Sequence, residues 1–450
     1  MDLPEHSEAM LKTETEKNAK NQSKLVFAMF YALGTVSHVP QTFYITANDY
    51  WMYKFRDPND LTNNSEDATK TDLQTQFSST YSIVSNICMV LSLLLTVFLA
   101  QKISVNRRIV TALSLIISLF VVTLMFVWID TDTWQGTFFG VSLIVGGLLN
   151  GSGACLMVSL FELATQFPPV YIGAILSGQS VCGIITSLLQ VITLAIESSS
   201  QVKARHGVCG NRSGDALARP PEEEFFQKQL NKEEEAAGPL NINRQVIFSI
   251  AKKISIILFT MVLTAGSMVS MHPGVTSLIE SVAKGSTRWG DLFFLPVCSF
   301  LTFNVFDFLG RETSIRTNLI TNKYIVLAIA VVRLVFIPLL LFCNIQPRHH
   351  LPVVFREDYA YSIFLSLFAF SSGYLMNICV VGIGSVCKRQ EMKIATALVV
   401  IVMVVSLATC SFFKHSAYKG NIEGMVMYIQ LNLFVIYLYH KKSEKQYILF

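Results

Sequence analysis

The sequence predicts an all-α, polytopic membrane protein, and three observations indicate this class. Hydrophobic residues make up 52% of the 450-residue chain and charged residues only 15%, against roughly 25% charged in ordinary soluble domains. The mean hydropathy is +0.47. Apolar stretches recur along the chain, each long enough to cross a hydrocarbon core of roughly 30 Å as a helix. Soluble enzymes are thereby excluded, and the small net charge of +4, spread over loops, excludes a nucleic-acid-binding protein.

The apolar stretches are predicted to be helices because backbone amides and carbonyls cannot go unpaired in lipid. Residues 109–129 show the pattern clearly, since they are apolar on every side, unlike the one-sided helices of soluble domains. Ten spans are predicted, at residues 25–47, 81–100, 109–129, 137–161, 170–196, 254–272, 292–310, 324–343, 360–384 and 394–413. A weaker segment at 424–439 is a candidate eleventh span.

Polar segments between the spans divide the chain into domains. The N-terminal residues are polar, without an apolar leader and cleavage site, so we expect a cytosolic tail. Loop 48–80 contains a glycosylation sequon at Asn63 and suits the non-cytosolic side. Residues 197–253 are rich in charge and indicate a solvated linker. The predicted order is a tail at 1–24, an N-terminal bundle at 25–196, the linker at 197–253, a C-terminal bundle at 254–413 and an extension at 414–450.

A polar stripe inside one predicted span is the richest candidate site. At about 100° per residue, Phe300, Asn304, Asp307 and Arg311 fall within an arc of roughly 60° on one helix face. Asp307 and Arg311 are spaced i,i+4 and can neutralise each other. One interpretation is a hydroxyl-binding site, because a carboxylate accepts and a guanidinium donates hydrogen bonds. The other is an ion pair that only fastens this helix to its neighbours.

Other polar residues inside the spans carry weaker signals. His38 and Gln41 flank Pro40, where a bent helix either exposes carbonyls to a cavity or is simply kinked. His272 precedes a proline at the end of a span and is interpreted as a satisfied interfacial histidine. Arg333 lies in the middle of a span and needs a buried partner or a water-filled cavity.

The polar stripe belongs to a longer motif. The run FLPVCSFLTFNVFDFLGR at 294–311, continued by 331–355 and 368–380, closely resembles the equilibrative nucleoside transporter family. ITANDYW at 45–51 and LSGQSVCG at 176–183 resemble the first and fifth spans of that family. The resemblance implies eleven spans in an arrangement related to the major facilitator architecture. It also implies transport of nucleosides such as adenosine and uridine down their gradient, without catalysis, cofactor or metal.

The resemblance also assigns roles to residues. Asp307 and Arg311 resemble the pair that engages the ribose hydroxyls, Asn304 lies on the same face, and Phe300 resembles part of the apolar wall. Ile45, in the match to the first span, is a further substrate-binding candidate. Gly178 matches a glycine where a larger side chain would obstruct the path, although the five-residue spacing of Gly173, Gly178 and Gly183 also suits close helix packing.

Three positions depart from the family pattern. Met157 stands where better-known members have a glutamine that faces the base, and Gln41 stands in place of a tryptophan. His272 replaces a phenylalanine and would permit a pH-sensitive variant, since histidine titrates near neutrality. A lost donor and acceptor pair is worth about 1 kcal/mol, so base preference cannot be copied from the family.

The family's sixth span has no counterpart in this sequence. Residues 198–224 carry six charged or titratable side chains between Lys203 and Arg219, and each charge near a helix centre costs about 2.5 to 3.5 kcal/mol. The segment therefore replaces a helix. An additional crossing would also place the basic loops at 316–323 and 388–393 in the cytosol, as Lys and Arg require. We hypothesise an alternative transcript or an erroneous gene model, which would include the tail at 414–450. The alternative is a divergent carrier that uses 424–439 as a replacement crossing.

The predicted function is facilitated nucleoside transport. Two alternatives stay open: a proton-coupled carrier of nucleosides or nucleobases, and a non-transporting variant that lacks one span. The N-terminal tail shows no clear acidic-dileucine signal, which favours the plasma membrane over a lysosomal or other acidic organelle membrane.

Overall fold

The computed structural model describes residues 24–44, 47–57, 71–99, 102–203, 244–317, 322–346 and 352–418. Within these ranges the chain is helical apart from turns and one antiparallel bridge between Ile279 and Ile345. Each of the ten predicted spans falls on a helix, which confirms the all-α class. Ile45, Asn63, residues 204–243 and the segment 424–439 lie outside the described residues.

Seven helical segments in the described ranges are long and apolar enough to cross a membrane: Val105–Trp128, Gln135–Ala164, Val170–Ile196, Ser255–Leu278, Trp289–Arg316, Lys323–Leu341 and Asp358–Val386. A shorter apolar stretch, Thr80–Thr96, lies within a longer helix. The helix at 24–44 is more polar, since it carries Ser37, His38 and Gln41.

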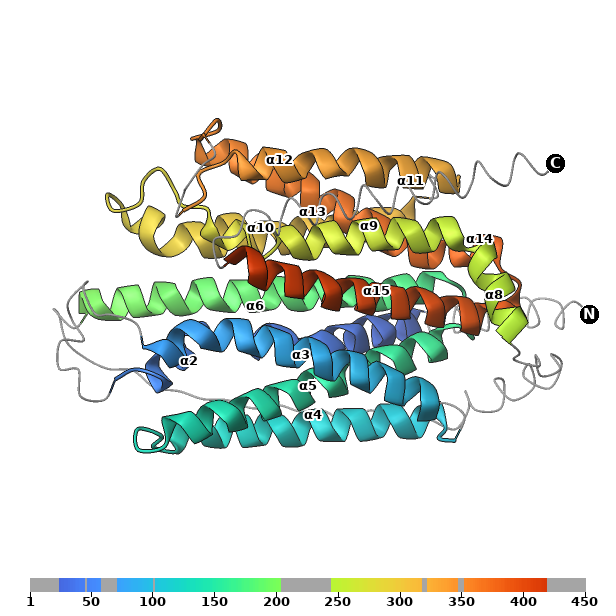
Figure 1. Cartoon of the computed structure of the whole chain (residues 1–450), viewed down its shortest axis with the longest axis horizontal. Coiled ribbons are helices and arrows are strands. Elements are labelled where there is room, and N and C mark those ends of the chain that lie inside the picture. The colour runs from blue at the N-terminus through green and yellow to red at the C-terminus, as the bar shows by residue number, and fades with distance from the viewer. Residues whose placement is uncertain are drawn as a thin grey trace, which may run out of the picture.

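The helices up to residue 203 form one group and most later helices form a second, beside the first (Figure 1). The first group contains the helix at 24–44, α2 (Asn48–Lys54), α3 (Asp72–Leu99), α4 (Val105–Trp128), α5 (Gln135–Ala164) and α6 (Val170–Lys203). The second contains α8 (Arg244–Lys253), α9 (Ser255–Met271), α10 (Thr302–Arg316), α11 (Lys323–Val332), α12 (Phe336–Leu341), α13 (Asp358–Val381) and α14 (Ile383–Val386). The last helix, α15 (Arg389–Tyr418), packs against α9 on one side and against α3 and α5 on the other.

Two spans of the second group depart from regular α-helix, and a proline explains each departure. The segment before α10 is π-helical, in η2 (Trp289–Phe293) and η3 (Leu295–Leu301), and Pro296 lies at the start of η3. Between α11 and α12 a turn of 3-10 helix, η4 (Arg333–Val335), precedes Pro338. Proline lacks the backbone N–H and clashes with the carbonyl four residues earlier, which disturbs the regular ladder. The sequence analysis did not predict these irregular turns.

Glycines let two helix pairs approach until their backbones touch. A Cβ placed on Gly310 of α10 would lie 2.1 Å from the carbonyl oxygen of Phe370, and one on Gly373 of α13 would lie 2.0 Å from that of Asp307. In the same way, a Cβ on Gly178 of α6 would lie 2.1 Å from the carbonyl oxygen of Tyr31 in the helix at 24–44. Small residues at helix contacts are the usual means of close packing in membranes.

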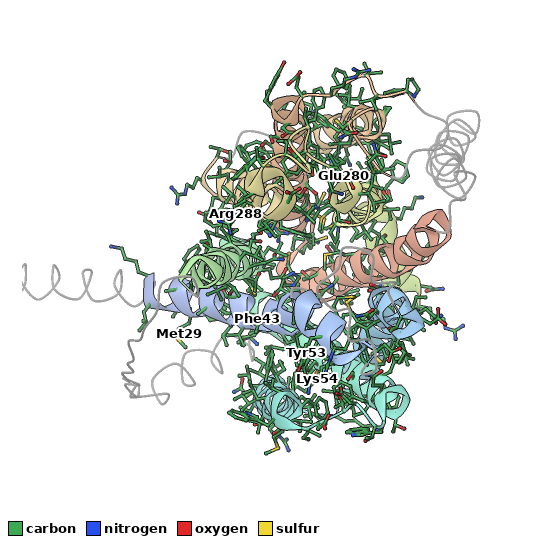
Figure 2. All side chains as sticks on the ribbon, turned by 90° about the vertical axis from the view of Figure 1, so that its left-hand side faces the viewer. Met29, Phe43, Tyr53, Lys54, Glu280 and Arg288 are labelled. Atoms are coloured by element: carbon green, nitrogen blue, oxygen red, sulfur yellow. The ribbon has the colours of Figure 1, made fainter. Side chains whose placement is uncertain are left out.

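The helix at 24–44 is strongly tilted relative to its neighbours. Figure 2 looks along the bundle, and there this helix, labelled at Met29 and Phe43, runs across the view while α4, α5 and α6 are seen nearly end-on. Its middle turns contact α6, because Thr35 Oγ1 donates a hydrogen bond of 3.0 Å to the carbonyl of Gly178. A later turn also contacts α6, since Thr42 Oγ1 lies 3.2 Å from Cys182 Sγ, so His38 and Gln41 lie between two contacts with α6.

Candidate functional site

A buried ion pair on α10 lies at the contact between the two helix groups. Arg311 Nε donates a hydrogen bond of 2.8 Å to Asp307 Oδ2, as the i,i+4 spacing predicts. Asp307 is 4% exposed and Arg311 is 6% exposed. Two bonds cross to α6: Arg311 Nη1 donates to the carbonyl of Leu176 at 2.8 Å, and Ser180 Oγ donates to Asp307 Oδ2 at 2.6 Å. The two charges therefore neutralise each other, and their hydrogen bonds to α6 also connect the two helix groups.

Only one of the two carboxylate oxygens of Asp307 accepts hydrogen bonds from the described residues. Its Oδ2 atom accepts from both Arg311 and Ser180, whereas Oδ1 is buried and has no hydrogen-bond partner among the residues that the structure describes. A buried acceptor left without a donor costs about 1 to 3 kcal/mol, and more for a charged group. Oδ1 is therefore well suited to accept a hydrogen bond from a hydroxyl that enters the site.

The other two residues of the predicted stripe lie on the same helix surface. Asn304 Nδ2 donates to the carbonyl of Gly183 at 3.2 Å and to Ser187 Oγ at 3.0 Å, both on α6. It also donates to the carbonyl of Phe300 at 3.0 Å. Asn304 is thus bound into the α6 contact, and a Cβ on Gly183 would lie 2.2 Å from its Oδ1 atom.

His272 lies just after α9 and packs against this same segment. Its ring stacks on Phe303, with centroids 3.8 Å apart and planes at 7°, and meets Phe300 edge-on at 5.8 Å. Its Nδ1 atom lies 2.9 Å from Thr276 Oγ1, at hydrogen-bond distance. The histidine is 9% exposed, so its ring is a buried aromatic member of the core.

A cavity of about 40 Å³ lies in the first helix group. Met157 of α5 is one of its walls, and Gln179 of α6 is another, next in the chain to Ser180, which donates to Asp307. The cavity has room for a few water molecules and is much smaller than a typical ligand pocket. Its lining residues are Ser37, His38, Pro40, Gln41, Met89, Asn150, Gly153, Ala154, Met157 and Gln179.

Gly178 has a packing role in this structure. A Cβ at this position would overlap the carbonyl oxygen of Tyr31, and Thr35 Oγ1 donates a hydrogen bond to the Gly178 carbonyl. These two contacts hold α6 against the helix at 24–44. The close-packing interpretation of this glycine therefore has direct support from the geometry.

Arg333 is buried in the second group and is 1% exposed. Its guanidinium donates to the carbonyl of Thr264 at 3.1 Å and to Ser267 Oγ at 2.9 Å, both on α9. It also donates to Ser371 Oγ on α13 at 3.3 Å and lies 4.5 Å from the ring centroid of Phe368. These contacts tie α9, η4 and α13 together, which is a structural role.

The sequence analysis missed Ser180 and Gln179 as site residues. Both lie in LSGQSVCG, which was interpreted through its glycines and its resemblance to the family's fifth span. The signal that could have found them is the cluster of two polar side chains in the middle of an apolar span, where each carries a cost and needs a partner.

Known proteins resemble this chain over most of its length. The nucleoside transporter family model matches residues 143–208 and 212–416. The chain is 30% identical to rat equilibrative nucleoside transporter 1 over 81% of this chain and 90% of that protein. The human protein of the same name is also 30% identical, over 89% and 98%, and rat equilibrative nucleoside transporter 3 is 26% identical over 83% and 84%. The chain is a multi-pass membrane transporter rather than an enzyme, and it belongs to the equilibrative nucleoside transporter family.

Proposed function

We propose that this protein carries nucleosides such as adenosine and uridine across a membrane, down their concentration gradient. The observation that carries the proposal is the buried Asp307–Arg311 pair at the contact between α6 and α10. A charged pair in a membrane protein is costly and usually marks a substrate pathway. Here the pair lies where two helix groups meet, which is the usual position of a transporter's substrate site.

The pair suits the hydroxyls of a ribose. Asp307 Oδ1 offers an acceptor without a partner among the described residues, and the Arg311 guanidinium offers donors beside it. One hydroxyl can donate to the carboxylate while its neighbour accepts from the guanidinium. Asn304 and Phe300 extend the same helix surface, as a polar neighbour and an apolar wall.

Transport follows if the two helix groups, 25–196 and 254–413, move against each other around this pair. The cavity of about 40 Å³ is smaller than a nucleoside, so the two groups must separate for a nucleoside to enter. Separation breaks the bonds from Ser180 to Asp307 and from Arg311 to the Leu176 carbonyl. A sugar hydroxyl can replace these bonds, so binding offsets the cost of opening.

The test is uptake of radiolabelled adenosine and uridine in transporter-deficient cells, with surface labelling to establish that the protein reaches the plasma membrane, where we propose it acts. Saturable uptake that stops when the inside and outside concentrations are equal is expected. Surface-exposed protein without uptake of either nucleoside would contradict the proposal.

A second candidate is a proton-coupled carrier, which one observation favours. His38 lines the cavity, and it is the titratable side chain among the cavity-lining residues. Uptake that rises at acidic pH and accumulates unmetabolised nucleoside above the outside concentration would favour this candidate over the equilibrative one.

A further inference from the structure

A buried lysine lies at one end of the first helix group. Lys54 is the last residue of α2, and Figure 2 labels it at the end of the bundle that faces the viewer. It is 6% exposed, and its ammonium donates one hydrogen bond, of 2.7 Å, to the carbonyl of Ile129 just after α4. A lysine ammonium has three N–H donors, so two have no acceptor in the part of the chain that the structure describes. A buried charge is costly unless it is paired.

The other buried cations of the described ranges are better compensated than Lys54. Arg108 forms an ion pair of 2.5 Å with Glu162, and Arg311 forms one with the carboxylate on its own helix. Arg333 has no carboxylate partner, but its guanidinium donates to two serine hydroxyls and to backbone carbonyls. Lys54 has one neutral acceptor, so its charge is the least compensated of the four.

The carboxylates of the adjoining loop do not neutralise Lys54. Asp132 forms an ion pair of 2.9 Å with Arg56. Asp130 accepts from the backbone N–H of Asp132 at the exposed surface. Among the described residues, no carboxylate oxygen lies within 4 Å of the Lys54 ammonium. The counter-ion of this lysine is therefore not one of these side chains.

Two buried hydroxyls accompany this lysine. Tyr50 lies one turn before Lys54 on α2, and its ring centroid is 5.8 Å from the ammonium nitrogen. Thr131 follows Ile129 by two residues and is 1% exposed. Tyr50 Oη and Thr131 Oγ1 are both buried and have no hydrogen-bond partner within the described ranges. Buried polar groups without partners are rare in folded proteins, so a set of such donors around one cation requires an explanation.

The surroundings of these donors are apolar. The ring of Trp51 packs edge-on against Tyr50 with centroids 4.8 Å apart, and Trp51 is 2% exposed. Phe55, next to Lys54 in the chain, is 0% exposed. Attraction between an ammonium and an anion is stronger in such low-dielectric surroundings than in water. Because the donors are buried, the anion must be small, and a monatomic ion can accept from several directions at once.

We propose that Lys54, Tyr50 and Thr131 bind a chloride ion at this end of the first helix group. The loop after α2 contains the sequon at Asn63, so we expect the site on the non-cytosolic side, where chloride is abundant. The ion neutralises the lysine and connects α2 to the loop after α4. The site uses none of the residues proposed to bind nucleoside, so this inference is independent of the proposed function.

The experiment measures thermal unfolding of the purified full-length protein in sodium chloride and in sodium gluconate, at equal ionic strength and without nucleoside. Gluconate is too large for a buried site, whereas bromide should replace chloride. We expect the wild-type melting temperature to be about 2 to 4 °C higher in chloride, because a ligand of the folded state stabilises it. Lys54→Met, which removes the charge at similar length, should abolish this shift.

Substitutions of the hydroxyls test the site without removing its charge. Tyr50→Phe and Thr131→Val should each raise the half-saturating chloride concentration about threefold to tenfold, the value of one hydrogen bond. Thr123→Val is the matched control, because the hydroxyl of Thr123 bonds within α4, to the carbonyl of Leu119. Lys284→Met is the control for charge, since that side chain is 51% exposed. Both controls should keep the wild-type shift.

Three results would overturn the inference. The first is equal wild-type melting temperatures in chloride and gluconate, which is expected if water binds these donors. The second is a shift of wild-type size in Lys54→Met. If Lys54→Met does not fold, the hydroxyl variants decide, and an unchanged half-saturating concentration in both would be the third.

Discussion

Ser180 of α6 donates a hydrogen bond of 2.6 Å to Asp307 of α10, across 127 positions of sequence. The same carboxylate oxygen accepts from Arg311, so a residue of the first helix group and a residue of the second share one atom. Asp307 therefore belongs both to the candidate substrate site and to a hydrogen bond that connects the two helix groups.

Substitutions in the ion pair test the sugar site. Asp307→Asn and Arg311→Ala should each lower nucleoside uptake about tenfold to a hundredfold, because hydrogen bonds to charged groups are worth about 1.5 to 3 kcal/mol. Removing one partner also leaves the other charge buried, so surface biotinylation and thermal stability must be measured alongside uptake. Deoxynucleosides should compete more weakly than ribonucleosides with wild type. Normal uptake by either variant would remove these residues from the site.

The contact between α10 and α13 predicts a glycine requirement. A Cβ on Gly310 would lie 2.1 Å from a backbone oxygen, so Gly310→Ala should destabilise the protein by about 1 to 3 kcal/mol. The matched control is Gly140→Ala on α5, where a Cβ meets nothing within 4 Å. That change should be neutral or stabilise the helix by about 0.5 to 1 kcal/mol. Thermal unfolding in detergent measures both, and equal melting temperatures would contradict the packing account.

Arg333 should be needed for stability but not for binding. Its guanidinium donates to groups on both α9 and α13, and a lysine ammonium cannot reproduce this planar geometry. Arg333→Lys should lower the melting temperature while the KM of the surviving protein stays unchanged. Arg316→Lys is the control, since that side chain is 76% exposed. A raised KM for Arg333→Lys would place this residue in the transport path.

Transport should not require a proton gradient. Asp307 is paired with Arg311, so it does not supply an isolated mid-membrane carboxylate for proton transfer. Uptake into cells treated with a protonophore should equal uptake into untreated cells. A strong decrease would instead support proton coupling through His38.

The segment that replaces the sixth span stays a prediction. α6 continues as helix to Lys203, seven residues beyond the predicted end of the fifth span, and residues 204–243 lie outside the described ranges. Sequencing the transcript across codons 195–230 and mapping protease access to the 197–253 loop would test the missing-span hypothesis. A verified transcript, a cytosolic loop and full uptake together would refute it.

Local patterns predicted part of this structure well. Apolar length located the spans, and i,i+4 spacing predicted the pair of Asp307 and Arg311, because both depend on one helix only. Ser180, Gln179 and the Leu176 carbonyl reach the site through the packing of α6 on other helices, which sequence spacing does not describe. The π-helical turns around Pro296 also depend on how α10 packs, since a proline alone predicts only a disturbance.

The position of α15 has a consequence for biosynthesis. This helix packs against α9 and against α3 and α5, and it follows every other described helix in the chain. During translation the two groups are therefore made first, and the contacts that α15 makes with both are added last. A nascent chain that stops before Arg389 would leave the facing surfaces of α3 and α9 in contact with lipid, so we expect such products to be recognised and degraded by membrane-protein quality control.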